Sequence, residues 1–334
     1  MAVSLKPLDR QVMVITGASS GIGLVTARAA AKAGASLLLV ARSEEALAAI
    51  CREIVAAGGA ADYAVADVGD AAAVEAVAAR AVARFGRIDT WVNDAGVAIY
   101  GKLMDTPADE HERLFRTNYF GMVNGARAAV PHLRAGGGVL ITVGSIASDL
   151  PSPLMGAYAA SKHAIKAYVE TLRMELEAEG APISVTLIKP SGIDTPIAEH
   201  AADRAGGAAR IPPPPYDPAL VANAILDAAV HPRREITIGG VGRAEVLFGE
   251  HFPKTFGRIA PMMARLFVDR SKPQPAPDNL FAPARDGNER SGEQAGRRFS
   301  LYTFAAEHRK AMLGIGALVG GVLLLARRRS RHSG

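Results

Sequence analysis

From Gln11 to about Gly240 the chain alternates short apolar runs with alanine-rich stretches of helical character. Most of the apolar runs show no alternation of polar and apolar residues, which is typical of strands buried on both faces of a sheet. Repeated strand–helix–strand units require parallel strands joined by crossover helices. The sequence therefore predicts an α/β fold, a doubly wound parallel sheet of about seven strands with helices on both faces. The predicted strands are Val12–Thr16, Ser36–Ala41, Ala60–Ala66, Ile88–Asn93, Val139–Val143, Ile183–Ile188 and Glu235–Ile238.

The helices expected around these strands are Gly21–Ala33, Glu44–Ala57, Ala71–Phe85, Tyr158–Ala178 and a helix near Pro218–Val230. The stretch Ala198–Pro218 is rich in Ala, Gly and Pro and follows the sixth predicted strand. Open α/β sheets place loops over a ligand crevice at this position. A substrate loop and a passive connector both fit this stretch, and the sequence leaves the choice open.

Four parts follow one another along the chain. Residues 1–245 form the predicted α/β domain, and residues 246–270 a helical extension, since the apolar spacing from Ala244 to Arg270 is helical. Residues 271–298 are polar and rich in Pro and Gly, which predicts a flexible linker. Residues 299–334 contain an apolar helix with a basic tail and form a candidate membrane anchor.

The apolar run Ala311–Ala326 is uncharged. As a helix it is about 24 Å long, short against a hydrocarbon core of about 30 Å. Gly316 and Gly320 form a small-residue pair on which membrane helices pack. A buried soluble helix is the alternative, weakened by the linker before the run and by apolarity all round it. We expect membrane association, and leave open whether the run spans the membrane, lies on it or packs on the protein.

Charge and residue types exclude several classes of function. Four arginines among the last eight residues account for most of the formal net charge of +5, so the rest of the chain has no basic face for nucleic acid. The eight histidines lack metal-ligand spacing, and we expect no metal. A single cysteine, Cys51, and the lack of an apolar signal sequence in Met1–Arg10 fit a cytoplasmic catalytic domain.

A glycine-rich segment, Thr16-Gly17-Ala18-Ser19-Ser20-Gly21-Ile22-Gly23, follows the first predicted strand and opens the first helix. Glycines permit a tight turn and let the backbone approach a pyrophosphate. The pyrophosphate then binds the N–H groups at the start of the helix. The strand–turn–helix context therefore predicts a dinucleotide site.

Tyr158 and Lys162 lie four residues apart on one predicted helix and therefore on one face of it. A nearby cation favours the phenolate, so we expect Lys162 to lower the pKa of Tyr158 toward working pH. The phenol then serves as an acid for carbonyl reduction or as a base for the reverse reaction. Ser145 ends the fifth predicted strand and is placed to donate to a substrate oxygen.

These motifs resemble the single-domain branch of the short-chain dehydrogenase/reductase family, which has a Rossmann-type fold. The resemblance covers roughly Gln11 to Gly240. The matching positions, in order, are Thr16–Gly23, Asn93-Asp94-Ala95-Gly96, Asn118, Ser145, Tyr158 and Lys162.

The resemblance implies a role for each matching residue. Tyr158 is the general acid/base, Ser145 orients the carbonyl, Lys162 binds the nicotinamide ribose, and Asn118 holds a water of a proton relay. Asp67 and Val68 meet the adenine ring. The predicted cofactor-binding residues are Thr16, Gly17, Ser19, Ser20, Gly21, Ile22, Gly23, Arg42, Ser43, Asp67, Val68, Asn93, Ala95, Gly96, Tyr158, Lys162, Pro190, Ile193 and Thr195.

Two positions depart from the family pattern. Asp94 stands where the family has a second asparagine, which adds charge and removes two donors. Ser191 replaces the glycine of a Pro-Gly turn after the sixth strand, while Thr195 keeps the residue expected near the nicotinamide carboxamide. Neither change touches the proton-transfer residues.

Cofactor choice follows from charge at the end of the second strand. An acidic residue there bonds the ribose 2′-hydroxyl of NAD and repels a 2′-phosphate. This chain has Ala41, followed by Arg42 and Ser43. A guanidinium beside an uncharged residue suits a phosphate, so the sequence favours NADPH over NADH.

The sequence thus predicts an NADPH-preferring oxidoreductase that transfers a hydride reversibly between nicotinamide and a small-molecule carbonyl or alcohol, with an apolar or lipid-like substrate and a homo-oligomeric state expected. One alternative is a non-catalytic NADPH-binding regulator, against which the complete set of proton-transfer residues argues. Another is a sugar-nucleotide epimerase or dehydratase of the same superfamily, which usually carries a larger carboxyl-terminal domain. Fold alone does not identify the substrate.

Overall fold

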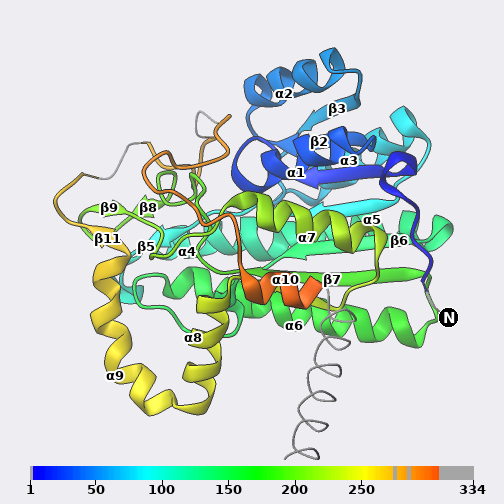
Figure 1. The fold of residues 1–334 in the computed structure, drawn as a ribbon. Coiled ribbons are helices and arrows are strands. Elements are labelled where there is room, and N and C mark those ends of the chain that lie inside the picture. The colour runs from blue at the N-terminus through cyan, green and yellow to red at the C-terminus, as the bar shows by residue number, and fades with distance from the viewer. Residues whose placement is uncertain (1–2, 274–276, 284–286, 308–334) are drawn as a thin grey trace, which may run out of the picture.

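The computed structural model describes residues 3–273, 277–283 and 287–307 of the chain, and its centre is a seven-stranded sheet (Figure 1). The strand order is β10-β7-β6-β4-β1-β2-β3, and every pair is parallel. This confirms the predicted doubly wound α/β fold, and each predicted strand is present. The strands are β1 (Val12–Thr16), β2 (Ser36–Ala41), β3 (Ala60–Val65), β4 (Thr90–Asn93), β6 (Gly138–Val143), β7 (Ile183–Pro190) and β10 (Glu235–Ile238).

Helices cover both faces of the sheet. The helices α1 (Gly21–Lys32), α2 (Glu44–Ala56) and α7 (Pro218–Val230) share one hydrophobic cluster with the sheet. The helices α3 (Ala71–Phe85), α5 (Gly121–Gly136) and α6 (Gly156–Ala178) share the cluster on the opposite face. Neighbouring residues of one strand divide between the clusters: Met13 and Ile15 pack on the first, Val14 on the second. Burial on both faces explains why the strands lack a polar/apolar alternation.

Short elements complete the domain around the sheet. They are η1 (Leu8–Arg10), η2 (Leu103–Asp105), α4 (Ala108–Phe115), the π-helical turn η3 (Arg116–Phe120) and η4 (Ile146–Ser148). Two small sheets stand apart from the main one: β5 (Ile99–Tyr100) pairs with β8 (Ala202–Asp203), and β9 (Ala208–Ala209) with β11 (Val268–Asp269).

The predicted helical stretch from Ala244 to Arg270 is not one helix. It contains α8 (Gly240–His251), α9 (Pro253–Met263), η5 (Ala264–Leu266) and β11. The break falls at Pro253, which has no N–H to continue α8 and instead occupies the first turn of α9. Figure 1 shows α8 and α9 projecting together from the body of the domain.

The segment 271–298 also differs from the flexible linker that its composition predicts. Its described residues form no helix and only an isolated bridge, between Arg297 and Tyr216. Yet they are bonded to the domain at many points, among them Asp217 and Asp194. After this segment, α10 (Leu301–Glu307) packs near β10, where Thr303 accepts a hydrogen bond from the Gly239 N–H. The chain thus returns to the domain beyond residue 270.

The predicted apolar run Ala311–Ala326 lies outside the described residues. Within the ranges that the structure describes, no helix has the length and apolarity needed to cross a membrane.

Candidate active site

One large cavity lies at the carboxyl ends of the parallel strands, among the residues that follow β1, β2, β4, β6 and β7. Open α/β sheets bind ligands at this edge. The cavity extends from the glycine-rich turn before α1 to the side chains of α8 and α9, and the stretch Ile211–Pro214 also lines it. The stretch after the sixth predicted strand therefore contributes to the cavity wall.

The glycine-rich turn owes its shape to contacts that only glycine permits. Gly17 has φ +73°, and a Cβ on it would lie 2.8 Å from the backbone nitrogen of Ala95. A Cβ on Gly23 would lie 2.2 Å from the carbonyl oxygen of Gly17. Thr16 Oγ1 accepts hydrogen bonds from the N–H groups of Asp94 and Ala95, at 3.1 and 3.2 Å. The turn is therefore packed tightly against the chain after β4, and it directs the start of α1 at the cavity.

Tyr158 and Lys162 lie on α6 and both line the cavity. The Lys162 ammonium is 5.5 Å from the centre of the Tyr158 ring and donates to the Val143 carbonyl at 3.0 Å. Ser145 follows β6, hydrogen-bonds with the Tyr158 hydroxyl, and accepts from the Ala147 N–H at 3.1 Å. The predicted serine, tyrosine and lysine therefore meet at one point of the cavity.

The electrostatics of this group differ from the expectation that a cation lowers the pKa of Tyr158. Burial raises the pKa of Tyr158 to about 12, and the hydrogen bond with Ser145 acts in the opposite direction. Burial also lowers the pKa of Lys162 to about 8, while Asp94 raises it. Burial is the largest cause of both shifts, so the phenol keeps its proton over the whole neutral range.

Asn118 lies in the π-helical turn η3 and is buried behind the cavity wall. Its Oδ1 accepts from the Val97 N–H at 2.8 Å, and its Nδ2 donates to the Val97 carbonyl at 3.0 Å and to Ser161 Oγ at 3.2 Å. These bonds connect η3 to the loop between β4 and β5, which contains Val97, and to α6, which contains Ser161. π-Helical turns recur at functional sites, and here the turn brings Asn118 to Ser161, the residue before Lys162 on α6.

Asp94, the departure from the family pattern, lines the cavity beside the turn. Burial raises the pKa of its carboxyl to about 7, against the attraction of Lys162 and a hydrogen bond from the Gly23 N–H. Asp94 and Lys162 therefore titrate near neutral pH and influence each other.

The far end of the cavity holds the residues predicted to bind the adenosine half. Arg42 and Val68 line it, as does Asp67. Asp67 accepts from Arg113 at 2.6 Å and from the Gly69 N–H at 2.9 Å. Burial raises the pKa of the Asp67 carboxyl, but these two bonds prevail and hold it below its ordinary value.

Most predicted cofactor residues line the cavity, and four do not. Thr16 and Gly23 shape the turn from behind, and Asn93 is buried, accepting from the Trp91 indole at 2.8 Å. Ser43 precedes α2 as its N-cap residue. The predicted residues that line the cavity are Gly17, Ser19, Ser20, Gly21, Ile22, Arg42, Asp67, Val68, Ala95, Gly96, Tyr158, Lys162, Pro190, Ile193 and Thr195.

Sequence reasoning did not identify one further part of the cavity wall. It comes from α8, α9 and the chain after them, where Phe256, Ala260, Met263 and Phe267 line the cavity with apolar atoms. Glu245 of α8 also lines it, and burial raises the pKa of its carboxyl. Asn279 and Pro283 line the cavity from the segment expected to be a linker. No motif marks these residues, because they reach the cavity through tertiary packing.

Comparisons with known proteins agree with this geometry. A family model described as short chain dehydrogenase matches residues 11–205, which include the glycine-rich turn, Ser145, Tyr158 and Lys162. The uncharacterized oxidoreductase YxnA of Bacillus subtilis (strain 168) is 40% identical over 335 residues, 98% of this chain and 94% of that protein.

Two solved structures are also similar. One is a short chain dehydrogenase/reductase from Burkholderia phymatum in complex with NAD, with 28% identity, a TM-score of 0.68, and coverage of 75% of this chain and 96% of that chain. The other is an alcohol dehydrogenase from Thermococcus sibiricus complexed with 5-hydroxy-NADP, with 27% identity, a TM-score of 0.61, and coverage of 68% and 95%.

Proposed function

Because this chain belongs to the short-chain dehydrogenase/reductase family, we propose that it transfers a hydride between NADPH and a carbonyl or alcohol, with Tyr158 as the proton-transfer residue. Membership makes the chain an NAD(P)-dependent oxidoreductase. One observation carries the proposal: a single cavity is lined by the glycine-rich turn at one end and by Ser145, Tyr158 and Lys162 at the other.

The residues present fit a dinucleotide. Gly17 and Gly23 leave no room for a Cβ, so the turn can take its tight shape only with glycine. In this shape the turn presents the N–H groups at the start of α1 to a pyrophosphate. Thr195 and Ile193 would lie along the nicotinamide half, and Asp67 and Val68 along the adenine. Bound nicotinamide supplies the hydride.

The protein's own residues would then transfer one proton to or from the substrate. In the direction of reduction, the Tyr158 phenol donates its proton to the carbonyl oxygen as negative charge develops there. The Ser145 hydroxyl, which is hydrogen-bonded to Tyr158, orients the carbonyl oxygen of the substrate toward the phenol. The Lys162 ammonium stabilises the phenolate left behind. In alcohol oxidation the same groups act in reverse.

NADPH preference rests on Arg42. This residue lines the cavity at the carboxyl end of β2, after the uncharged Ala41. A phosphate on the ribose would find a cation there and no carboxylate at the strand end. The test is the ratio of kcat/KM for NADPH and NADH, before and after Ala41→Asp is combined with Arg42→Ala. A parent enzyme that prefers NADH contradicts this part of the proposal.

An apolar substrate fits the other end of the cavity, where α9 contributes Phe256, Ala260 and Met263. Each methylene buried there gains about 0.8 kcal/mol, so kcat/KM should rise up to about fourfold per carbon along a series of linear ketones. The series is assayed by following NADPH oxidation. A flat series contradicts the apolar assignment, and NADPH binding without turnover of any carbonyl or alcohol supports the regulator instead.

Membrane association is the remaining part of the proposal. Besides the predicted run Ala311–Ala326, the outer face of α9 and its flanks combines exposed large apolar side chains with basic residues, as interfacial helices do. The inner face of the same helix lines the cavity. A lipid-like substrate would thus enter from the surface on which α9 lies. The exposed residues are Phe252, Lys254, Arg258, Ile259, Met262, Arg265 and Leu266.

A further inference from the structure

Residues 277–283 and 287–297, here called the strap, pass over the cavity instead of leaving the domain as a linker. Two of the strap's residues, Asn279 and Pro283, line the same cavity as the glycine-rich turn. A ligand that fills this part of the cavity would therefore contact both the turn and the strap.

The strap bonds directly to the glycine-rich turn. The Gly21 N–H donates to the Asn288 carbonyl at 2.9 Å, and the Gly287 N–H donates to the Ser19 carbonyl at 3.0 Å. Both turn residues line the cavity. The strap thus closes over the turn where a pyrophosphate would bind.

At the adenosine end, the strap is held by two arginines and one apolar side chain. Arg42 donates to the carbonyl groups of Asn279, Leu280 and Phe281. Arg113, which also binds Asp67, donates to the Leu280 carbonyl at 2.9 Å. The Leu280 residue is 1% exposed and packs in the cluster that contains Leu114 and Ala157. This end of the strap is therefore anchored in the core, and it fixes the guanidinium expected to meet the cofactor's ribose phosphate.

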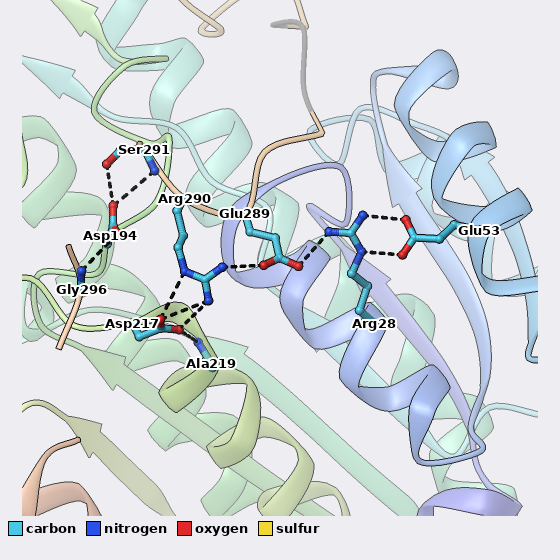
Figure 2. Close-up of polar contacts among 9 residues, drawn as sticks. All are labelled: Arg28, Glu53, Asp194, Asp217, Ala219, Glu289, Arg290, Ser291 and Gly296. Atoms are coloured by element: carbon cyan, nitrogen blue, oxygen red, sulfur yellow. Dashed lines mark hydrogen bonds and ion pairs between the residues drawn. The ribbon is translucent and has the colours of Figure 1, made fainter. Parts of the chain in front are cut away.

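The other end is held by ion pairs (Figure 2). Arg290 Nε and Nη2 bond both carboxylate oxygens of Asp217 at 3.0 to 3.2 Å. Asp217 is the N-cap of α7, and its side chain is only 6% exposed. Burial raises the pKa of this carboxyl, but the bonds from Arg290 and the Ala219 N–H hold it below its ordinary value. Arg290 thus neutralises a carboxylate that has little access to water.

Two further carboxylates strengthen this end of the strap. Glu289 bridges Arg290, at 2.7 Å, and Arg28 of α1, at 2.8 Å. Asp194 is buried between Ile193 and Thr195, and it accepts from the Ser291 hydroxyl and the Gly296 N–H. Figure 2 shows these groups joining the strap to α1 and α7 and to the chain after β7. The strap is therefore fixed to three elements that surround the cavity.

We propose that the strap is part of the cofactor site, and that Arg290 latches it over the bound dinucleotide and so sets the rate of cofactor release. The inference rests on the proposed function, since it takes the cavity to hold NAD(P). A dinucleotide between the turn and the strap leaves only when the bonds at Ser19 and Gly21 open. The Arg290–Asp217 pair, close to Asn288 along the strap, resists this opening. Arg290 is thus a positioning residue: it touches neither the substrate nor the reacting atoms.

The test is the dissociation rate of NADPH from the full-length chain, measured by stopped-flow fluorescence after mixing with excess NADP. Arg290→Gln shortens the side chain and removes its charge, so the bidentate contact is lost while Asp217 remains to cap α7. Loss of a charge-assisted contact of this kind predicts release about tenfold faster. Arg290→Lys, which restores one charged bond, should give an intermediate rate. The rate of hydride transfer in a single turnover should stay unchanged.

Arg80→Gln is the matched control. Arg80 bonds both oxygens of Asp62 at 2.8 and 2.9 Å, as Arg290 does with Asp217, but its partner lies on β3 away from the strap. Its release rate should equal that of the wild type. A second readout without cofactor is amide hydrogen exchange, which should quicken at Gly21 and at 287–297 in Arg290→Gln and not in Arg80→Gln.

The outcomes separate the two proposals. Faster release together with faster exchange supports the latch. An unchanged release rate in Arg290→Gln, with NADPH binding intact in the wild type, overturns the latch and leaves the proposed function standing. A wild-type chain that binds neither NADPH nor NADH overturns the proposed function, and the strap's role with it.

Discussion

Tyr158 illustrates how one side chain depends on surroundings that a sequence motif does not describe. The four-residue spacing to Lys162 places the ammonium near the ring, as expected, but burial dominates and raises the pKa of the phenol to about 12. Carbonyl reduction needs a protonated phenol, and this pKa keeps the proton in place at neutral pH.

Replacement of that proton donor is the first prediction. Tyr158→Phe keeps the ring and removes the hydroxyl, so kcat for carbonyl reduction should fall by roughly two to four orders of magnitude. NADPH affinity should persist, because the glycine-rich turn lies at the other end of the cavity. Steady-state kinetics and a fluorescence titration with NADPH measure the two effects. Near-normal turnover in this variant contradicts the catalytic assignment.

Asp94 gives a prediction on pH. Burial raises the pKa of its carboxyl from 3.8 to about 7. Between these two pH values the folded chain holds a proton that the unfolded chain releases, so the free energy of unfolding falls as the pH rises. Above about pH 7 the contribution of Asp94 no longer changes with pH. A carboxamide at this position would not titrate. The advantage in Tm of Asp94→Asn over the wild type should therefore grow from about pH 5 to about pH 8.

Thermal unfolding at several pH values checks this sign. The exposed Asp105 provides the control, since Asp105→Asn should shift Tm by a similar amount at each pH. Parallel curves for Asp94→Asn and the wild type contradict the burial argument.

At the scale of the element, the regular core was predictable and its surroundings were not. The strands β1 and β2 have the predicted bounds, because each is a largely apolar run in a buried parallel sheet. The strand β10 also has the predicted bounds, although Glu235 and Thr237 alternate there with Ile236 and Ile238. The proximity of Lys162 to the Tyr158 ring was predictable, because a spacing of four residues on a helix places both side chains on one face. The strap was not, because its polar, Pro- and Gly-rich composition is the same whether it is solvated or bound. Its order comes from partners far away in the sequence, such as Asp217 and Arg28.

The glycine-rich turn gives a prediction at this scale. In Gly23→Ala the new Cβ would lie 2.2 Å from the Gly17 carbonyl oxygen, so the turn must change its shape. NADPH affinity should fall at least about tenfold, with the Tm lowered as well. Gly257→Ala is the control: nothing lies within 4 Å of its Cβ on α9, so it should bind NADPH normally. Equal affinities in the two variants contradict the close packing of the turn.

At the scale of the whole molecule, the chain after residue 270 contributes both to the wall of the cavity and to the packing around β10. The strap closes the cofactor cavity, while α10 packs near β10 through Thr303, which is buried. A truncation before α10 would therefore remove part of the domain. A cut after Glu307 keeps every contact that the structure describes and removes the predicted anchor Ala311–Ala326.

Membrane binding is predicted on this basis. The full-length chain should sediment with anionic phospholipid vesicles and resist high salt, because burial of apolar surface is not screened. The chain cut after Glu307 should keep its activity and bind vesicles only weakly, through the basic and apolar face of α9. High salt should release this shorter chain from the vesicles. Adding Phe252→Ser and Met262→Ser to this shorter chain should abolish the remaining binding. A full-length chain that stays in the supernatant contradicts the anchor, and a shorter chain unaffected by the serine variants contradicts the role of α9.

The strap follows the glycine-rich turn and the sheet along the chain, and this order matters during synthesis. Domains generally fold as they leave the ribosome, amino-terminal part first. The sheet ends at Ile238, and the glycine-rich turn lies at its start, so both emerge well before Arg290. During translation the cavity therefore passes through a stage in which the sheet and the glycine-rich turn are complete and the strap has not yet been made. A nascent chain at that stage can take up its dinucleotide without opening anything, and the strap, which is translated after the sheet, then closes over a cofactor already in place.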